Sequence, residues 1–496
     1  MTAEPGARRY VLEPLDTSGV FLGLAPIPCG LLGAAFTVAA LGITGGLPVV
    51  AALAPLPAAA AFAFGRIGGH PLWEWLPLAV RWLCGLVLHR RRWVAPLPLF
   101  PTGGAGRVRT PPLPPCLAGL EVWDVPWRGP LRMGAVHDRQ LYTLTALLMV
   151  SGPPFVLETT DEQERLLAGW GDVLAQFAGT DGTVTQVFWS DLSCPMGRPD
   201  RPGRAGHVDE DLPPAESYRR LLDEAGSSAS SHETAVGLTV RLRDGRRRTA
   251  GADPGDLLGQ TLVAAVEGLV RGLHSAGCAV DGPLDMMGLH RLLRRRVDPL
   301  DSAEVVAPGD LAGRLRLVTP ESSGPLALDT GWRRLRVDGA WHRVWWVASW
   351  PRSPVPPAWL EPFLSATGVA RTMTVASMPV PGHRSRRRIE RDLVKLESDA
   401  AAKQEKGRRI DARHERATQA LLDREAELVA GYAEMAYVGL VSVTARTESE
   451  LEDHAEIVEQ AARQAGMDLR LLDGRQDAAW AASLPLGLAP RSLTGT

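Results

Sequence analysis

The chain has 496 residues, with 54 Lys and Arg, 56 Asp and Glu, and a formal net charge of −2 at pH 7. This balance argues against nucleic-acid binding driven by the overall charge of the protein. The five cysteines are widely spaced, with no Cys-x-x-Cys pair and no Cys–His cluster. That spacing is typical of a reducing compartment and offers no obvious zinc site, so we expect no metal and no cofactor.

The N-terminal part contains a long uncharged run, because residues 20–64 include no Asp, Glu, Lys, Arg or His. A membrane helix needs about 20 apolar residues. The run therefore predicts a two-helix transmembrane hairpin over residues 20–66, turning at Gly45-Gly46, after an N-terminal tail of residues 1–19. A cleaved signal peptide is disfavoured because the apolar core is too long. A buried hairpin of a soluble core is disfavoured because the flanking charges all lie outside the run.

Arginines flank the hairpin on both sides, and its turn is neutral. The positive-inside rule then predicts a multi-pass cell-membrane protein with both termini in the cytoplasm. Residues 67–94 are expected to form an interfacial Trp-rich helix and a basic stop, with a re-entrant segment as the alternative. The expected membrane anchor residues are Arg66, Trp73, Trp75, Arg81, Trp82, Arg90, Arg91 and Arg92.

The rest of the chain predicts an α+β protein with two cytoplasmic units. A Pro-rich linker over 95–116 leads to the first unit, 117–300, and a connecting segment over 301–340 leads to the second, 341–488. In the first unit we expect strands over 119–125, 131–137, 141–150, 183–190 and 234–243, and helices over 160–177, 254–275 and 284–296. In the second we expect strands over 343–349, 369–380, 435–444 and 467–472, and helices over 357–366, 449–465 and 476–483.

A long charged segment, 383–430, has almost no Gly or Pro, and its apolar residues recur at spacings of three and four. The pattern predicts a helical arm or two packed helices, whose apolar stripe covers either its own sheet or another chain. The expected docking residues are Leu393, Leu421, Leu428, Arg386, Arg387, Arg388, Leu484 and Pro485. A second basic run, Arg291–Arg296, is expected to be a solvated helix face or a contact for anionic lipid or an acidic partner.

The run Ala481-Ala482-Ser483-Leu484-Pro485-Leu486-Gly487 comes after an expected strand–helix–strand and the charged helical segment. This arrangement resembles the N-terminal region of the type IV secretion ATPases of conjugation systems. The two-span hairpin in front resembles the small membrane subunit that partners that ATPase. The whole layout is similar to a family of actinobacterial membrane proteins encoded with conjugative-transfer machinery. The resemblance implies membrane subunits and a cytoplasmic ATPase as partners.

The motor of such an ATPase requires the motif G-x-x-x-x-G-K-[ST], whose backbone amides and lysine hold the phosphates. The only Lys-Gly pair here is Lys406-Gly407, in the wrong order and inside an expected helix. The sequence also lacks G-x-S-x-G and HExxH. The pair His137-Asp138 is expected to form a turn between strands.

These observations predict a protein that is not an enzyme. We expect an inner-membrane scaffold of a conjugation-like type IV secretion machine, which contacts the lipid bilayer and recruits a separate ATPase and other membrane subunits. Sequence-specific contact with nucleic acid is not expected, and homo-oligomerisation is left open. The alternatives are a membrane component of another export apparatus, such as a type VII-like one, and a membrane-tethered enzyme with an unrecognised site.

Overall fold

A computed structural model describes residues 26–46, 48–67, 70–87, 91–95, 113–178, 182–195, 230–242, 254–300, 324–351, 353, 355–380, 382–405, 412–429 and 434–488. The chain divides into two units, each of which is described by itself. The larger comprises Met1–Pro14, Arg92–Leu472 and Gln476–Thr496, and the smaller comprises Leu15–Arg91 with Asp473–Arg475.

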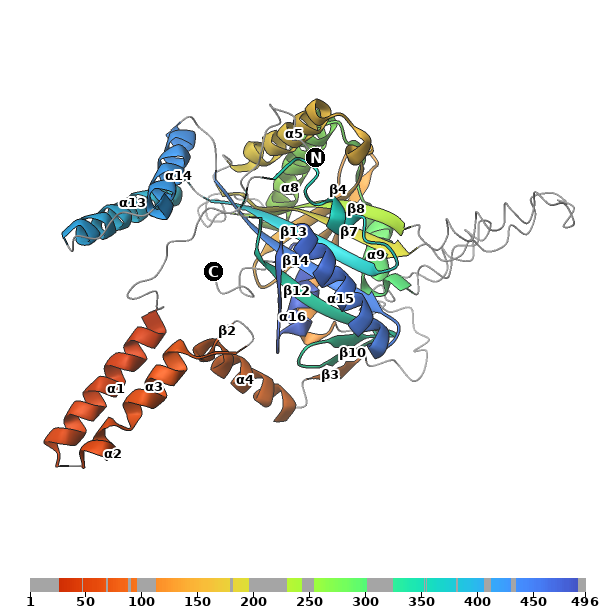
Figure 1. Ribbon diagram of the computed structural model, residues 1–496. Coiled ribbons are helices and arrows are strands. Elements are labelled where there is room, and N and C mark those ends of the chain that lie inside the picture. Colours follow the sequence, from red (N-terminus) through yellow and green to blue (C-terminus); the bar gives the residue numbers. More distant parts are fainter. Residues whose placement is uncertain are drawn as a thin grey trace, which may run out of the picture. The chain divides into compact units, whose positions relative to one another are not determined.

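The smaller unit is mainly helical. It contains α1 (Pro26–Thr44), α2 (Val49–Leu53), α3 (Pro55–Phe64), the two-residue strands β1 (Arg66–Ile67) and β2 (His70–Pro71), and α4 (Leu72–Val87). Helices α1 and α3 pack side by side (Figure 1). The break between α2 and α3 comes directly before Pro55, because proline lacks the amide hydrogen that a helix interior requires and is accepted in a first turn.

The predicted transmembrane hairpin is wrong. Among the residues that the structure describes, no helix combines the length and the apolar character needed to cross a bilayer. The second expected span is divided at Ala54 into α2, with 5 residues, and α3, with 10. A helix of 10 residues is about 15 Å long, half of the hydrocarbon thickness. The prediction of a two-span, multi-pass localisation is wrong for the same reason, and the orientation inferred from the arginines loses its basis.

The larger unit contains one antiparallel sheet of 13 strands within its described residues. Its strands are β3 (Arg92–Val94), β4 (Leu120–Pro126), β5 (Arg132–Asp138), β6 (Thr143–Ser151), β7 (Val184–Pro195), β8 (Ser230–Arg241), β9 (Ala279–Pro283), β10 (Ala327–Thr330), β11 (Leu335–Val337), β12 (Ala340–Ser349), β13 (Ala370–Pro379), β14 (Met435–Ala445) and β15 (Asp468–Leu471). The helices are α5 (Thr160–Ala178), α8 (Pro254–Ser275), α9 (Met286–Val297), α12 (Glu361–Leu364), α13 (Gly382–Glu405), α14 (Ala412–Val429), α15 (Glu448–Gln464) and α16 (Gln476–Ser483), with short 3₁₀ turns η1 (Pro115–Leu117) and η2 (Phe155–Leu157).

The prediction of two separate α+β units is also wrong, because strands of both units join this single sheet. The strand order is β3-β10-β11-β12-β14-β13-β7-β8-β6-β5-β4, with β15 added to β12 and β9 added to β6. Outward from the central β7–β13 pair, the order β7-β8-β6-β5-β4 on one side matches β13-β14-β12-β11-β10 on the other, and β3 is added beyond β10. Each side is therefore one copy of an internal repeat. The first repeat runs from β4 to α9, and the second runs from β10 to α16.

Details of the backbone support the repeat. A glycine with positive φ comes two residues after the end of each of two helices: Gly277, with φ of 81°, after α8 and Gly466, with φ of 75°, after α15. After each glycine the next residue, Cys278 or Met467, donates its amide to the carbonyl five residues back. This is the hydrogen-bond pattern of a Schellman cap, which favours glycine in the left-handed conformation. The next strands in the chain, β9 and β15, each pair beside a register shift in β6 and β12.

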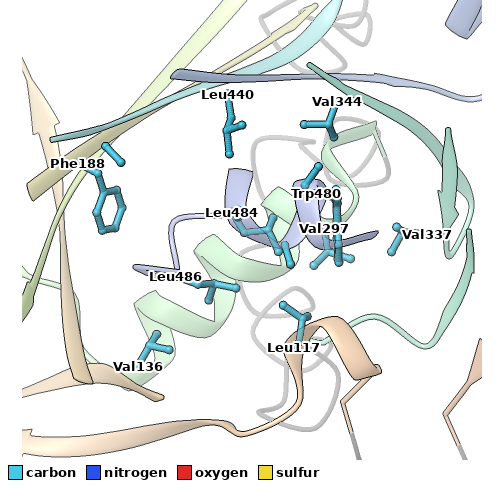
Figure 2. Packing of buried hydrophobic residues seen from close by; sticks show 14 of the residues in the cluster. Leu117, Val136, Phe188, Val297, Val337, Val344, Leu440, Trp480, Leu484 and Leu486 are labelled. Carbon is cyan, nitrogen blue, oxygen red and sulfur yellow. The ribbon is translucent and has the colours of Figure 1, made fainter. Parts of the chain in front are cut away.

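Helices cover both faces of the sheet. On the outer face, α5 and α8 pack over the first repeat, and α12 and α15 pack over the second. On the inner face, α9 and α16 share one apolar cluster with strands of both repeats. Figure 2 shows Val136 and Phe188 of the first repeat and Val344 and Leu440 of the second directed toward these two helices. The inner cluster therefore joins the two repeats into one core.

The C-terminal run Leu484-Pro485-Leu486-Gly487 helps to hold the repeats together. Leu484 and Leu486 are buried in the shared inner cluster (Figure 2). Gly487, with φ of 71°, lies against a buried pair of hydroxyls in the first repeat, Thr145 Oγ1 and Thr239 Oγ1, which are 2.9 Å apart. A Cβ at Gly487 would overlap both hydroxyls. The run thus extends from α16 onto the sheet of the first repeat.

We predict that Gly487→Ala lowers the free energy of unfolding by about 2 kcal/mol or more, because it combines an unfavourable φ with overcrowding. Gly129→Ala is the matched control, since Gly129 also has a positive φ, 54°, but its Cβ would meet nothing within 4 Å. Urea unfolding of both variants measures the difference. Equal losses in the two variants would contradict the packing of Gly487 between the repeats.

Candidate functional site

The predicted anchor residues lie in several elements. Arg66 is in β1, and Trp73, Trp75, Arg81 and Trp82 are in α4, whereas Arg90 lies outside the described residues. The Arg91 guanidinium lies 3.2 Å from the centroid of the Trp82 ring and donates to the Trp82 carbonyl. Arg92 belongs to the larger unit, where it pairs with Asp329 across β3 and β10. The exposed apolar side chains of α4 are Val80, Leu83, Leu86 and Val87.

The predicted arm is a pair of helices, α13 and α14, which come between β13 and β14 in the chain. The two helices pack on each other (Figure 1). Ile389 and Leu396 are buried along α13, and Leu393 and Leu421 are half-buried. Leu428 lies in α14, and its side chain is outside the described set. The apolar stripe is therefore largely covered within the arm.

The outward surface of the arm differs from this seam, the apolar stripe along which α13 and α14 pack. Arg386, Arg387 and Arg388 are exposed, and within the described residues no carboxylate lies within 4 Å of them. Three large apolar side chains of the arm are also exposed, Val394, Leu422 and Val429. In contrast, the predicted docking residues Leu484 and Pro485 are buried in the core. Of the predicted docking residues, those that are exposed thus belong to the arm.

A second candidate site lies where the two repeats meet. We call it the junction cluster: Asp191, His232, Glu233, Arg295, Arg296 and Arg371. Strands β8, β7 and β13 are neighbours here, and the C-terminal end of α9 approaches their inner face. The expectation that Arg291–Arg296 forms a solvated face or a surface contact holds for the exposed Arg291 but not for Arg296, which is 3 % exposed.

On the inner face, the guanidinium of Arg296 donates from Nη2 to the backbone carbonyls of Ser190, at 3.3 Å, and Glu233, at 2.8 Å. The Glu233 carboxylate lies 3.6 Å from Arg296 Nη2 and 3.2 Å from Arg295 Nε. Burial lowers the pKa of Arg296, and the negative charges of Glu233 and Asp191 oppose that shift. Among the described residues, Arg296 Nε and Nη1 have no hydrogen-bond partner.

On the outer face, Asp191 organises its neighbours. Its carboxylate accepts a hydrogen bond from Thr234 Oγ1 at 2.9 Å and lies 3.1 Å from His232 Nδ1. Arg371 donates to the carbonyls of Leu364 and Ala366. Burial lowers the pKa of Arg371 to about 10, although the charge of Asp191 opposes the shift. The buried Asp191 carboxylate thus holds the ring of the half-exposed His232 in place.

A Ser–His–Asp arrangement is suggested by the register, because Ser193 faces His232 in the β7–β8 ladder. A nucleophilic serine must hydrogen-bond the histidine and be open to substrate. Ser193 Oγ is buried and has no hydrogen-bond partner among the described residues. The nearby thiol of Cys194 is buried too, and burial raises its pKa to about 11. Neither side chain is arranged as an activated nucleophile.

The second repeat provides an internal comparison. Ser190 faces Ala235 in the β7–β8 ladder, Thr374 faces Leu440 in the β13–β14 ladder, and Ser190 and Thr374 face each other. To align residues of α9 with residues of α16, we match the proline that comes after each helix, Pro299 with Pro485. By these matches, the equivalents of Asp191, Glu233, Arg295 and Arg296 are Val375, Val438, Ala481 and Ala482. The fold therefore forms with apolar residues where the junction cluster has charges.

Other buried polar groups are better explained by packing. His137 stacks on Trp123, with ring centroids 3.9 Å apart, and burial lowers its pKa. His342 is fully buried beside Thr444, and burial lowers its pKa to about 4. His137 and Asp138 are the last two residues of β5, so the prediction that this pair forms a turn is wrong. Asp138 accepts from the amides of Gln140 and Leu141, which lie in the turn after the strand. The described part of the chain contains no group of three His, Cys, Asp or Glu side chains placed to bind a metal ion.

Models of known protein families give no match to this chain. A comparison with curated protein sequences gives no match either.

We predict that Glu233→Gln lowers the free energy of unfolding by about 3 kcal/mol, because Arg296 would be left buried without its carboxylate. The double variant Glu233→Val with Arg296→Met, which copies the apolar character of the second repeat, should stay within about 1 kcal/mol of the unsubstituted chain. Urea unfolding of the three proteins measures both values. A double variant that loses more stability than the single one would show that the fold itself requires the charges.

Proposed function

We propose that this protein is a non-catalytic docking subunit of a conjugation-like type IV secretion machine, to which it recruits a separate ATPase. The kind of machine is inferred from the resemblance of the C-terminal sequence to the N-terminal region of such ATPases. The observation that carries the docking role is the arm, whose apolar stripe is largely covered while Val394, Leu422 and Val429 are exposed on its outside.

The outer surface of the arm combines two features of a recognition surface. Val394, Leu422 and Val429 have exposed fractions of 64 %, 45 % and 79 %. All three belong to the two helices of the arm, and exposed apolar patches mark sites of protein contact. The three exposed arginines are consecutive in α13, so their like charges lie close together. An acidic partner would neutralise these charges.

The smaller unit supports the same role. It contains more than half of the large hydrophobic side chains that are exposed in the described residues, including Phe36, Val50 and Phe64. Helices that are apolar on all sides normally have their surface covered by other chains or by a core. We therefore assign this unit to contacts with other subunits of the machine.

We predict that Leu422→Asp together with Val429→Asp abolishes co-purification with the conjugation-type ATPase that the proposal requires as a partner, and leaves the melting temperature unchanged. Ile457→Asp is the matched control, because Ile457 is an exposed apolar residue of α15, 42 % exposed, outside the arm. Leu393→Asp with Leu421→Asp should instead destabilise the arm, since both residues are half-buried in its seam.

Co-purification of that ATPase from cells and thermal unfolding measure the two effects. Retained co-purification in the Leu422 and Val429 variant, with a folded arm, would contradict the proposal. A neighbouring ATPase of the type VII class would favour the other export apparatus.

A further inference from the structure

We propose that the inner side of the junction cluster is a binding site for a small oxyanion, a phosphate or a carboxylate, held by Arg295 and Arg296. The proposal is independent of the docking role. It is based on an unpartnered buried guanidinium, an excess of positive charge and the comparison between the two repeats.

The first observation is the state of Arg296. Its side chain is fully buried, and only Nη2 of its three nitrogens has a hydrogen-bond partner among the described residues. Burying unsatisfied donors of a charged group destabilises the fold, because the group loses its hydrogen bonds to water and gains none in exchange. A guanidinium presents its donors as a planar fork, which suits the two oxygens of a carboxylate or phosphate. The unpartnered nitrogens are therefore suited to a ligand of this class.

The second observation is the balance of charge. On the inner side of the sheet, two guanidiniums, of Arg295 and Arg296, are opposed by one carboxylate, of Glu233. Burial raises the pKa of the nearby Cys194 thiol, so the thiol adds no negative charge near neutral pH. These three side chains thus have an excess of one positive charge, which a bound anion would neutralise.

The third observation is access. The side chain of Arg295 is 35 % exposed and that of Glu233 is 20 % exposed, whereas that of Arg296 is 0 % exposed. An oxyanion can therefore approach along Arg295 and be held by Arg296 behind it. The second repeat has Ala481 and Ala482 at the equivalent positions, within the apolar cluster. Buried charges that the fold does not require are retained at a cost in stability, and ligand binding would account for that cost.

The test is isothermal titration calorimetry of the full chain with sodium phosphate, and separately with sodium glutamate, at constant ionic strength set by chloride. We expect saturable binding of at least one of them. Arg295→Ala should weaken that binding at least tenfold, which equals about 1.4 kcal/mol. Arg291→Ala is the matched control, because Arg291 is an exposed arginine of the same helix, outside the junction cluster, and should leave the affinity unchanged.

The two titrations separate the sources of the anion. Binding of phosphate alone assigns the site to a phosphate group, and binding of glutamate alone assigns it to a carboxylate. Thermal unfolding in chloride shows whether Arg295→Ala is folded, and Arg295→Gln replaces it if it is not. The proposal is overturned if neither anion binds saturably, or if Arg291→Ala weakens binding as much as Arg295→Ala.

Discussion

The antiparallel pairing of β7 with β13 is the interaction on which the rest of the structure depends. Seven residues of each strand face each other from Arg371 opposite Ser193 to Ser377 opposite Val187. At the centre Thr374 Oγ1 donates to the carbonyl of Ser483, the last residue of α16 on the inner face, and shares a hydrogen bond with Ser190 Oγ. This pairing removes the exposed strand edge that each repeat would otherwise present, and edges of that kind promote aggregation. It also places α9 and α16 together under one sheet, so that both helices share a core.

The duplication explains how the structure can hold unfavourable buried charges. The second repeat fills the end of its helix with apolar side chains, including Ala482 and Leu484. The first repeat has Arg296 and Asp298 at the matching positions. Stability supplied by the shared inner cluster allows the first repeat to keep a charged site near the point where the repeats join. The second repeat differs in another respect, because its central strand β13 leads directly into the arm, with its exposed arginines.

Local structure could be predicted from the sequence, whereas its assembly could not. The helices expected over 254–275 and 476–483 are α8 and α16 to the residue, because periodicity and capping are local signals. The repeat was missed because its only clear sequence trace is short, Ala276-Gly277-Cys278 against Ala465-Gly466-Met467, where the glycines end equivalent helices. The hairpin was overestimated because an uncharged run measures apolar length but not the helix breaks at its prolines. Arg296 was expected on the surface because a basic run does not reveal which of its members faces a sheet.

Native-state hydrogen exchange of the full chain tests most directly whether the β7–β13 pairing makes one cooperative unit. The account predicts that the central amides of β7 and β13 exchange only through a single shared opening, with the same free energy and the same dependence on denaturant. Exchange of the β7 amides through an opening of markedly lower free energy, while the β13 amides remain protected, would contradict it. That result would mean that the two repeats are separate folding units that only touch.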